Sequence, residues 1–161
     1  MDSVDSDILN ILQKNAKTSN TDIAKELGMV PSAIFERIRK LEDRGIIEKY
    51  RTIINPASVE LNLIAFVMIE SATTNWSKQC TDKLTKISHV EEVYEIMGDY
   101  SYYIKIRAKD MDHLSNILKI EVGSIPEVKS TRSIMVVKSL KEYAPYPIPA
   151  PKKIKAIRKK K

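Results

Sequence analysis

Only three residues separate two segments whose apolar side chains recur at helical spacing, residues 20–27 and residues 31–44. Gly28 suits the end of the first helix, because glycine adopts left-handed backbone angles without strain. Pro31 suits the first position of the second helix, because it has no N–H group to leave unpaired. Asn20 is the expected N-cap of the first helix. The short spacing therefore predicts two helices joined by a tight turn.

The second of these helices is amphipathic, with Ile34, Ile38 and Leu41 on one apolar stripe. One flank gathers Ala33, Arg37, Lys40 and Arg44. A further helix is predicted over residues 5–14, where acidic residues can cap the start of an apolar run. A supporting helix followed by a helix pair around a tight turn predicts a helix-turn-helix DNA-binding domain over residues 1–55.

The segment after this helix, residues 46–54, has the composition of a strand. It predicts a short wing or a connecting strand. Asn55 and Pro56 follow as a turn signal and mark the expected domain boundary.

Residues 56–143 have a different hydrophobic pattern, in which apolar segments typical of strands alternate with segments typical of helices. Strands are predicted over residues 63–72, 90–97, 100–108 and 128–137, and helices over residues 75–87 and 111–122. Trp76, Cys80, Leu84 and Ile87 are expected to face the core, and Gly98 with Asp99 predicts a hairpin. The order βαββαβ predicts an α+β domain of the ferredoxin-like type, whose open sheet face tends to pair with another copy.

The formal net charge of +6 is unevenly distributed. Residues 1–55 contain nine basic and nine acidic residues, residues 56–143 eleven and twelve, and residues 144–161 seven and none. The basicity therefore resides in a predicted Pro-rich tail over residues 144–161, with prolines at alternate positions. Two interpretations stay open for this tail: non-specific contacts to flanking DNA, or a solubilising extension.

Several function classes find no support in the sequence. It contains no apolar run of the roughly 18 residues that span a membrane, and its acidic N-terminus is unlike a secretory signal. The single cysteine, Cys80, fits a reducing compartment, so a cytoplasmic location without membrane partners is expected. His89 and His113 lack partners at metal-ligand spacing, and no phosphate loop or catalytic Cys/His pair is present. We therefore expect no metal, no cofactor and no enzymatic activity.

Five segments, in order, carry a resemblance to a known family: MDSVDSDILNIL, DIAKELGMVPSAIFERIRKLEDRGII, INPASVELNLIAFVMI, VEEVYEIMGDYSYYIKI and IPEVKSTRSIMVV. Over residues 1 to about 140 the chain resembles the Lrp/AsnC family of prokaryotic transcription regulators. The resemblance implies homodimers built through the C-terminal sheets, often assembled into tetramers or octamers. It also implies small effectors, usually amino acids, bound between dimers near the Gly-Asp-Tyr loop.

The resemblance places a nearly universal arginine of the family at Arg37, which we therefore expect to contact a phosphate of double-stranded DNA, with Arg39 and Lys40 as helpers. The complete predicted DNA site comprises Pro31, Ser32, Ala33, Phe35, Glu36, Arg37, Arg39 and Lys40. The competing interpretation is a solvated charged face stabilised by pairs such as Glu36 with Lys40. Phe35 either packs partly into the domain or contacts a thymine methyl group. Glu36 either pairs internally, which we expect, or accepts from a cytosine amino group.

The predicted effector site comprises Gly98, Asp99, Tyr100, Ser101 and Tyr102, with Thr131 and Ser133 from a neighbouring dimer. A free amino acid needs an acceptor for its ammonium group and N–H donors for its carboxylate, which Asp99 and the turn backbone can supply. The competing interpretation is an ordinary tight hairpin in which Asp99 stabilises its own turn. Ser101, Glu127 and Glu60 depart from residues that the family usually has there, and the departure at Ser101 removes one ammonium acceptor.

These observations predict a sequence-specific regulator in which a dimer places two recognition helices in successive major grooves of a pseudo-palindromic operator. The alternative is an architectural DNA-binding protein with weak site preference and no effector.

Overall fold

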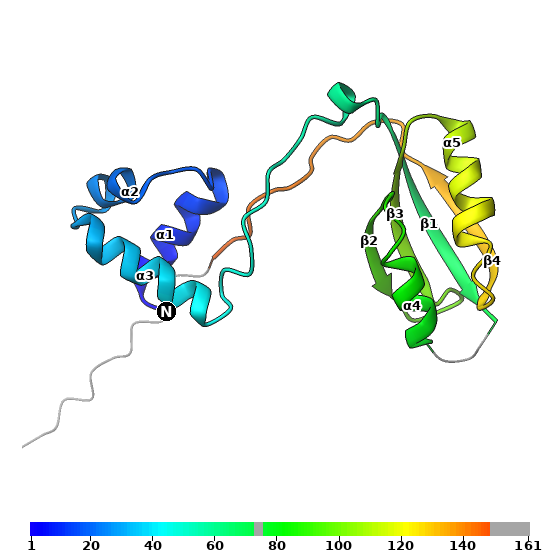
Figure 1. The fold of residues 1–161 in the computed structure, drawn as a ribbon, viewed down its shortest axis with the longest axis horizontal. Coiled ribbons are helices and arrows are strands. Elements are labelled where there is room, and N and C mark those ends of the chain that lie inside the picture. Colours follow the sequence, from blue (N-terminus) through cyan, green and yellow to red (C-terminus); the bar gives the residue numbers. More distant parts are fainter. Residues whose placement is uncertain (73–75, 149–161) are drawn as a thin grey trace, which may run out of the picture. The chain divides into compact units, whose positions relative to one another are not determined.

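The computed structural model describes residues 1–72 and 76–148, which form two compact units. The first unit comprises residues 1–53 together with the described residues from Lys141 onward, and the second comprises Ile54–Leu140 (Figure 1). No helix in these described ranges is both long and apolar enough to cross a bilayer.

Three helices make up the first unit: α1 (Ser3–Lys14), α2 (Asn20–Leu27) and α3 (Pro31–Asp43). Asp2 caps α1 by accepting the backbone N–H of Asp5, whose carboxylate accepts the backbone N–H of Asp2 in return. The N-cap of α2 is Ser19, not the expected Asn20, because the Ser19 hydroxyl accepts the N–H of the third residue of the helix. Gly28 ends α2 at φ +65°, as its position predicts.

The core of the first unit is built from the apolar faces of these helices. Its buried members are Ile8, Leu9, Leu12, Ile23, Ala24, Ile34 and Leu41. Ile34 and Leu41 face this core as the periodicity predicts, and each such side chain contributes about 1.5–3 kcal/mol through burial. The core therefore determines which face of α3 remains free.

The predicted wing or connecting strand over residues 46–54 is wrong, since this stretch pairs with no strand among the described residues. The N–H groups of Ile46 and Ile47 instead donate to the carbonyl of Leu41 at 2.9 and 3.1 Å. These bonds close the C-terminal turn of α3 and satisfy its Leu41 carbonyl.

The beginning of the predicted tail is part of the first unit. The Gln13 side chain accepts the Tyr146 N–H at 2.7 Å and donates to the Tyr146 carbonyl at 3.3 Å. Ile148 packs against the helical core. The remaining residues of the predicted tail, 149–161, lie outside the described part of the chain.

The second unit follows the predicted βαββαβ order. Its elements are a 3-10 turn (Pro56–Val59), β1 (Leu63–Ser71), α4 (Lys78–Leu84), β2 (Val90–Glu95), β3 (Tyr102–Ala108), α5 (Met111–Asn116), a π-helical continuation (Ile117–Val122) and β4 (Val128–Met135). The sheet order is β2-β3-β1-β4 with every neighbouring pair antiparallel. This arrangement confirms the ferredoxin-like prediction.

Glu60 occupies the linker position at which the family usually has glycine. Its φ of +58° explains that preference, because left-handed backbone angles cost a residue with a Cβ atom some strain. The side chain of Glu60 is held by Lys109, whose Nζ lies 2.8 Å from a carboxylate oxygen.

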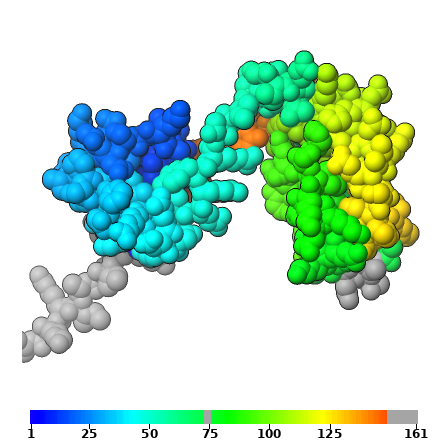
Figure 2. All heavy atoms as spheres, in the orientation of Figure 1, coloured from blue at the N-terminus to red at the C-terminus, as the bar shows by residue number. Residues whose placement is uncertain are grey.

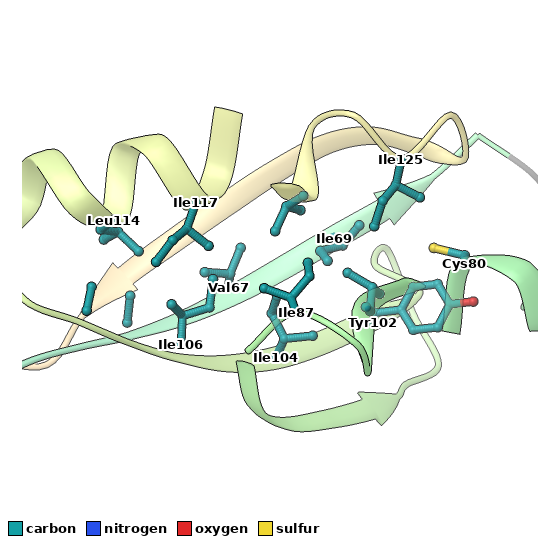
Figure 3. Packing of buried hydrophobic residues seen from close by; sticks show 14 residues of the cluster. Val67, Ile69, Cys80, Ile87, Tyr102, Ile104, Ile106, Leu114, Ile117 and Ile125 are labelled. Atoms are coloured by element: carbon teal, nitrogen blue, oxygen red, sulfur yellow. The ribbon is translucent and has the colours of Figure 1, made fainter. Parts of the chain in front are cut away.

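The core of the second unit lies between the sheet and helices α4 and α5 (Figure 3). Val67, Ile104 and Ile106 point from the sheet toward Leu114 and Ile117 of the helical layer (Figure 3). Cys80, Leu84 and Ile87 are buried there as predicted, but Trp76 is 46% exposed and does not face the core. Trp76 lies before the start of α4, so helical spacing does not apply to it.

Candidate DNA interface and effector loop

The N-terminal half of α3 is open to an external partner. Val30 precedes it without a side-chain cap, and Pro31 removes one N–H group at the first position. Ser32, Phe35 and Glu36 are exposed, and atoms of this segment lie on the surface of the unit (Figure 2). An uncapped helix start suits a phosphate oxygen as an acceptor, so the local geometry matches a nucleic-acid-binding helix.

Arg37 has a different environment from the one predicted for it. One of its terminal nitrogens lies 2.7 Å from a carboxylate oxygen of Asp5 and 2.8 Å from one of Asp2. These hydrogen bonds, with Asp2 contributing most, raise the pKa of Arg37. The backbone N–H of Asp5 and then the Arg37 guanidinium lower the pKa of Asp2. Arg37 therefore ties α3 to the start of α1, and a phosphate contact by this side chain stays a prediction that must compete with two carboxylates.

The expected ion pair between Glu36 and Lys40 is absent among the described residues. Arg39 instead approaches Asp43 at 3.9 Å, and both of these side chains are more than 60% exposed. Glu36 has no hydrogen-bond or ion-pair partner in the described chain. The internal pairing expected for Glu36 is therefore wrong, and its carboxylate faces solvent.

Phe35 is 53% exposed and lies outside the buried core and the partly buried side chains around it. The packing alternative for Phe35 therefore finds little support. Ala33 is half-buried, while Lys40 and Arg44 are exposed and have no carboxylate partner among the described residues. The cations available on the outer side of α3 are thus Arg39, Lys40 and Arg44, rather than Arg37.

The second candidate site is the loop between β2 and β3. The expected two-residue hairpin at Gly98 and Asp99 is wider, because β2 ends at Glu95 and β3 begins at Tyr102. Gly98 adopts φ +128°, which only glycine reaches without strain. Asp99 is exposed and makes no hydrogen bond or ion pair to a described residue, so it does not stabilise its own turn.

Ser101 and Trp76 hold the base of this loop. The N–H of Ser101 donates to the Ile69 carbonyl at 2.9 Å, and the Ser101 carbonyl accepts from the Ile96 N–H at 2.9 Å. The Trp76 indole N–H donates to the carbonyls of Ile96 and Ser101 at 3.2 and 3.1 Å. Sequence periodicity placed Trp76 in the core and thus missed its contact with the loop.

Tyr102 belongs to the core rather than to an open site. Its side chain is fully buried beside Cys80 (Figure 3). Its hydroxyl accepts the Ser77 N–H at 3.0 Å and donates to the Ser77 carbonyl at 3.2 Å. An effector contact by Tyr102 is therefore not supported, whereas Tyr100 is half-buried and Asp99 is free.

Thr131 and Ser133 lie on the edge strand β4, opposite Ile69 and Val67 of β1. Because β1 separates β4 from β3, these hydroxyls lie roughly 10 Å from the start of β3 within one chain. The structure therefore does not bring them to the loop of the same chain. Their contact with the effector loop of a neighbouring dimer stays a prediction.

The sheet face opposite the helices carries aromatic rings and an ion network. The Phe66 and Tyr103 rings stack at 5.3 Å between centroids. Glu91 lies 2.5 Å from Arg107 Nε and 3.1 Å from Lys105 Nζ, and both cations are less than 10% exposed. Burial alone would raise the pKa of Glu91, but hydrogen bonds from Arg107 and Lys105 outweigh it and lower that pKa. A β-bulge between Val90 and Glu92 places Glu91 here, which alternation could not show.

Comparison with known proteins agrees with this architecture. Residues 1–48 match a winged helix-turn-helix DNA-binding family, and residues 64–146 match the Lrp/AsnC ligand binding domain. The HTH-type transcriptional regulator FL11 of Pyrococcus furiosus is 37% identical over 148 residues, which cover 92% of this chain and 97% of that protein. The leucine-responsive regulatory protein of Escherichia coli K12 is 31% identical over 144 residues, covering 88% of each chain.

A solved transcriptional regulator of Neisseria meningitidis, in complex with L-Met, has a TM-score of 0.82 and 26% identity. It covers 91% of this chain, and this chain covers 96% of it. These relatives are described as transcription regulators rather than as enzymes. The chain belongs to the Lrp/AsnC family of helix-turn-helix transcription regulators.

Proposed function

We propose that this chain binds specific sites on double-stranded DNA as a homo-oligomer and that an amino acid modulates this binding. The observation that carries the proposal is the free outer face of α3. Phe35 on this face is exposed, and Glu36 and Lys40 have no partner among the described residues. The apolar stripe and Arg37 fasten the helix to the other helices. Family membership supports the same conclusion.

The proposed roles of the α3 side chains follow from their positions and charges. Ser32, Phe35 and Glu36, near the helix start, approach base edges in the major groove. Lys40 and Arg44, together with Arg39, neutralise phosphates and supply affinity that falls with salt. Arg37 acts mainly to hold α3 against the start of α1 through Asp2 and Asp5.

A homodimer is the proposed minimal unit, formed through the sheet face that carries Phe66, Met68 and Tyr103. Among the described residues, the buried core that α4 and α5 help to form lies on the opposite face of the sheet. A two-fold symmetric dimer that carries two copies of α3 suits two half-sites about 34 Å, or roughly 10 base pairs, apart. Assembly into tetramers or octamers is part of the proposal, as is the domain division near residues 53–56.

An amino acid is the proposed effector, with the loop at Gly98 and Asp99 as its site. The free Asp99 carboxylate suits an ammonium group, and turn N–H groups suit a carboxylate. Tyr100 and Ser101 border the loop, and Thr131 and Ser133 would come from a neighbouring dimer. The L-Met complex of the related Neisseria regulator supports this choice of ligand class.

The test of the DNA proposal is selection of bound sequences from a random duplex pool, with and without a panel of amino acids. Recovery of a two-fold symmetric motif is the expected result. Enrichment of no common motif would refute site-specific binding and favour an architectural role. Lys40→Ala should weaken binding to all sequences and reduce the salt slope by about one phosphate contact, whereas the matched control Lys86→Ala, in the second unit, should change neither.

The test of the effector proposal is an amino-acid titration of Asp99→Asn. This variant should lose the response to every amino acid that changes oligomeric state or DNA binding of the wild type. Asp112→Asn is the matched control, since it removes another exposed carboxylate in the same unit. An unchanged response in Asp99→Asn would move the effector site away from this loop.

A further inference from the structure

Two consecutive residues on the outer face of α3, Phe35 and Glu36, have side chains that the fold does not use. Phe35 leaves 53% of a large aromatic residue in water. Glu36 leaves a carboxylate without any partner in the described chain. With Ser32 and Arg39 they recur at the spacing that places residues along one helix face, away from Ile34, Ile38 and Leu41.

An exposed phenylalanine on this face has limited uses against DNA. Its ring cannot donate or accept a conventional hydrogen bond, so it cannot bind a phosphate or read a polar base edge. The C5-methyl group of thymine is the apolar feature that the major groove presents. Phe35 therefore fits a thymine methyl group.

The free carboxylate of Glu36 on the same face has even fewer possible partners on DNA. Glu36 repels phosphate oxygens and cannot bond to the acceptor atoms of guanine or to thymine O4. Adenine N6 lies beside the acceptor N7, whereas cytosine presents its N4 amino group as a donor without that neighbour. Glu36 therefore fits a cytosine amino group, and the absence of Lys40 or another cation at its carboxylate leaves it free for that bond.

We propose that α3 reads a thymine through Phe35 and a cytosine through Glu36 within the same half-site. The inference rests on the proposed DNA-binding function and specifies the base preference of that site. Adjacent helix residues differ by about 1.5 Å in rise and 100° in direction. The two bases therefore belong to adjacent base pairs or to base pairs separated by one other pair. Glu36 also lowers affinity for non-cognate DNA by repelling phosphates, which sharpens selectivity.

The expected effects are different for the two residues. Loss of one buried methyl group corresponds to about a fourfold decrease in affinity. Loss of recognition at one base pair reduces discrimination by roughly 5- to 150-fold, the range that corresponds to a typical mismatch. Non-cognate DNA should bind Glu36→Gln more tightly than it binds the wild type, because a repulsive charge has been removed.

The experiment uses the full-length chain and the site that the wild type selects from a random pool. Each thymine of that site is replaced in turn by deoxyuracil, which differs from thymine by the methyl group alone. One replacement should weaken wild-type binding about fourfold and leave Phe35→Ala binding unchanged. A second selection with Glu36→Gln should lose the preference for one cytosine, while the control Glu48→Gln keeps the wild-type motif. Circular dichroism confirms that every variant is folded.

The possible outcomes distinguish failure of the proposed base preference from failure of the proposed DNA-binding function. If the wild type selects no motif, the proposed site-specific function fails. If the wild type selects a motif but no deoxyuracil replacement weakens binding, or Glu36→Gln retains every base preference, the inference is overturned while the function stands. A motif whose half-site lacks thymine or cytosine overturns it in the same way.

Discussion

Replacement of Arg37 by alanine should destabilise the helical unit without affecting the ferredoxin-like unit. The guanidinium connects α3 to the start of α1 through Asp2 and Asp5, residues that lie 35 and 32 positions earlier in the chain. The Asp5 side chain is only 13% exposed, and after the substitution it would keep the Asp2 N–H as a donor but lose its cation. A largely buried carboxylate deprived of its charged partner is the source of the expected cost.

The magnitude follows from the exposure of each pair. A hydrogen bond to a charged group, left unsatisfied when its partner is removed, costs about 1–3 kcal/mol, and this range applies to Asp5. The pair with Asp2 adds well under about 1 kcal/mol, because its carboxylate is 53% exposed and water screens it. A loss of about 1–3 kcal/mol is large against the roughly 5–15 kcal/mol that stabilise a typical domain.

The two units can be followed separately during urea unfolding. Trp76 is the only tryptophan, and it lies in the second unit, so its fluorescence reports on that unit. Far-ultraviolet circular dichroism contains a large contribution from α1, α2 and α3. In Arg37→Ala the dichroism transition should move to lower urea while the Trp76 transition stays in place.

Arg39→Ala is the matched control for this experiment. Its guanidinium is 62% exposed and lies 3.9 Å from Asp43, so its removal should change stability by less than about 0.5 kcal/mol. Equal stability of Arg37→Ala and Arg39→Ala would refute the structural role of Arg37. It would then favour the phosphate contact that the resemblance implies.

Three further predictions concern other contacts. The lowered pKa of Asp2 means that its contribution to stability is complete above its ordinary value of 3.8 and is lost as pH falls through the lower folded value, so Asp2→Asn should abolish that part of the acid sensitivity seen by circular dichroism. Ile148→Asp should destabilise the first unit alone, by roughly 1–3 kcal/mol, because a charge would replace an apolar side chain packed against its core; an unchanged urea midpoint of that unit would show that this contact is dispensable. Glu91→Gln should shift the sedimentation equilibrium toward monomers at neutral pH, because the ion network of Lys105 and Arg107 on this face loses one of its carboxylates; an unaltered distribution would place the dimer interface elsewhere.

Local patterns predicted most of the elements and failed where a contact came from a distant part of the chain. Gly28 and Pro31 act through their own backbone preferences, so the α2–α3 joint was predictable. Trp76 was misplaced because it precedes the helix whose period was applied to it. The expected strand over residues 46–54 failed because composition says nothing about whether a partner strand is near.

In the candidate sites, too, local patterns could not predict features that depend on tertiary contacts. The position of Phe35 on the helix left both packing and exposure open, and only the structure shows that it is exposed. The missing pair of Glu36 with Lys40 could not be predicted either, because spacing permits an ion pair without requiring it. Tyr102 was assigned to the effector loop because it follows Gly98 and Asp99 closely in sequence. Strand alternation turns its ring into the core instead, where Ser77 satisfies the hydroxyl.

The sequence by itself determined the order of elements, the helix-turn-helix joint, the βαββαβ topology and the family, since these depend on periodicity, on backbone preferences and on motifs in register. Only the tertiary structure decided what each charged side chain does. Arg37 and Arg39 are two residues apart on one helix, yet the first is held by two carboxylates at the start of α1, one of them from its N-cap Asp2, and the second is largely in water. The physical reason is that electrostatic pairing depends on distance in space, and residues more than thirty positions apart supply the partners.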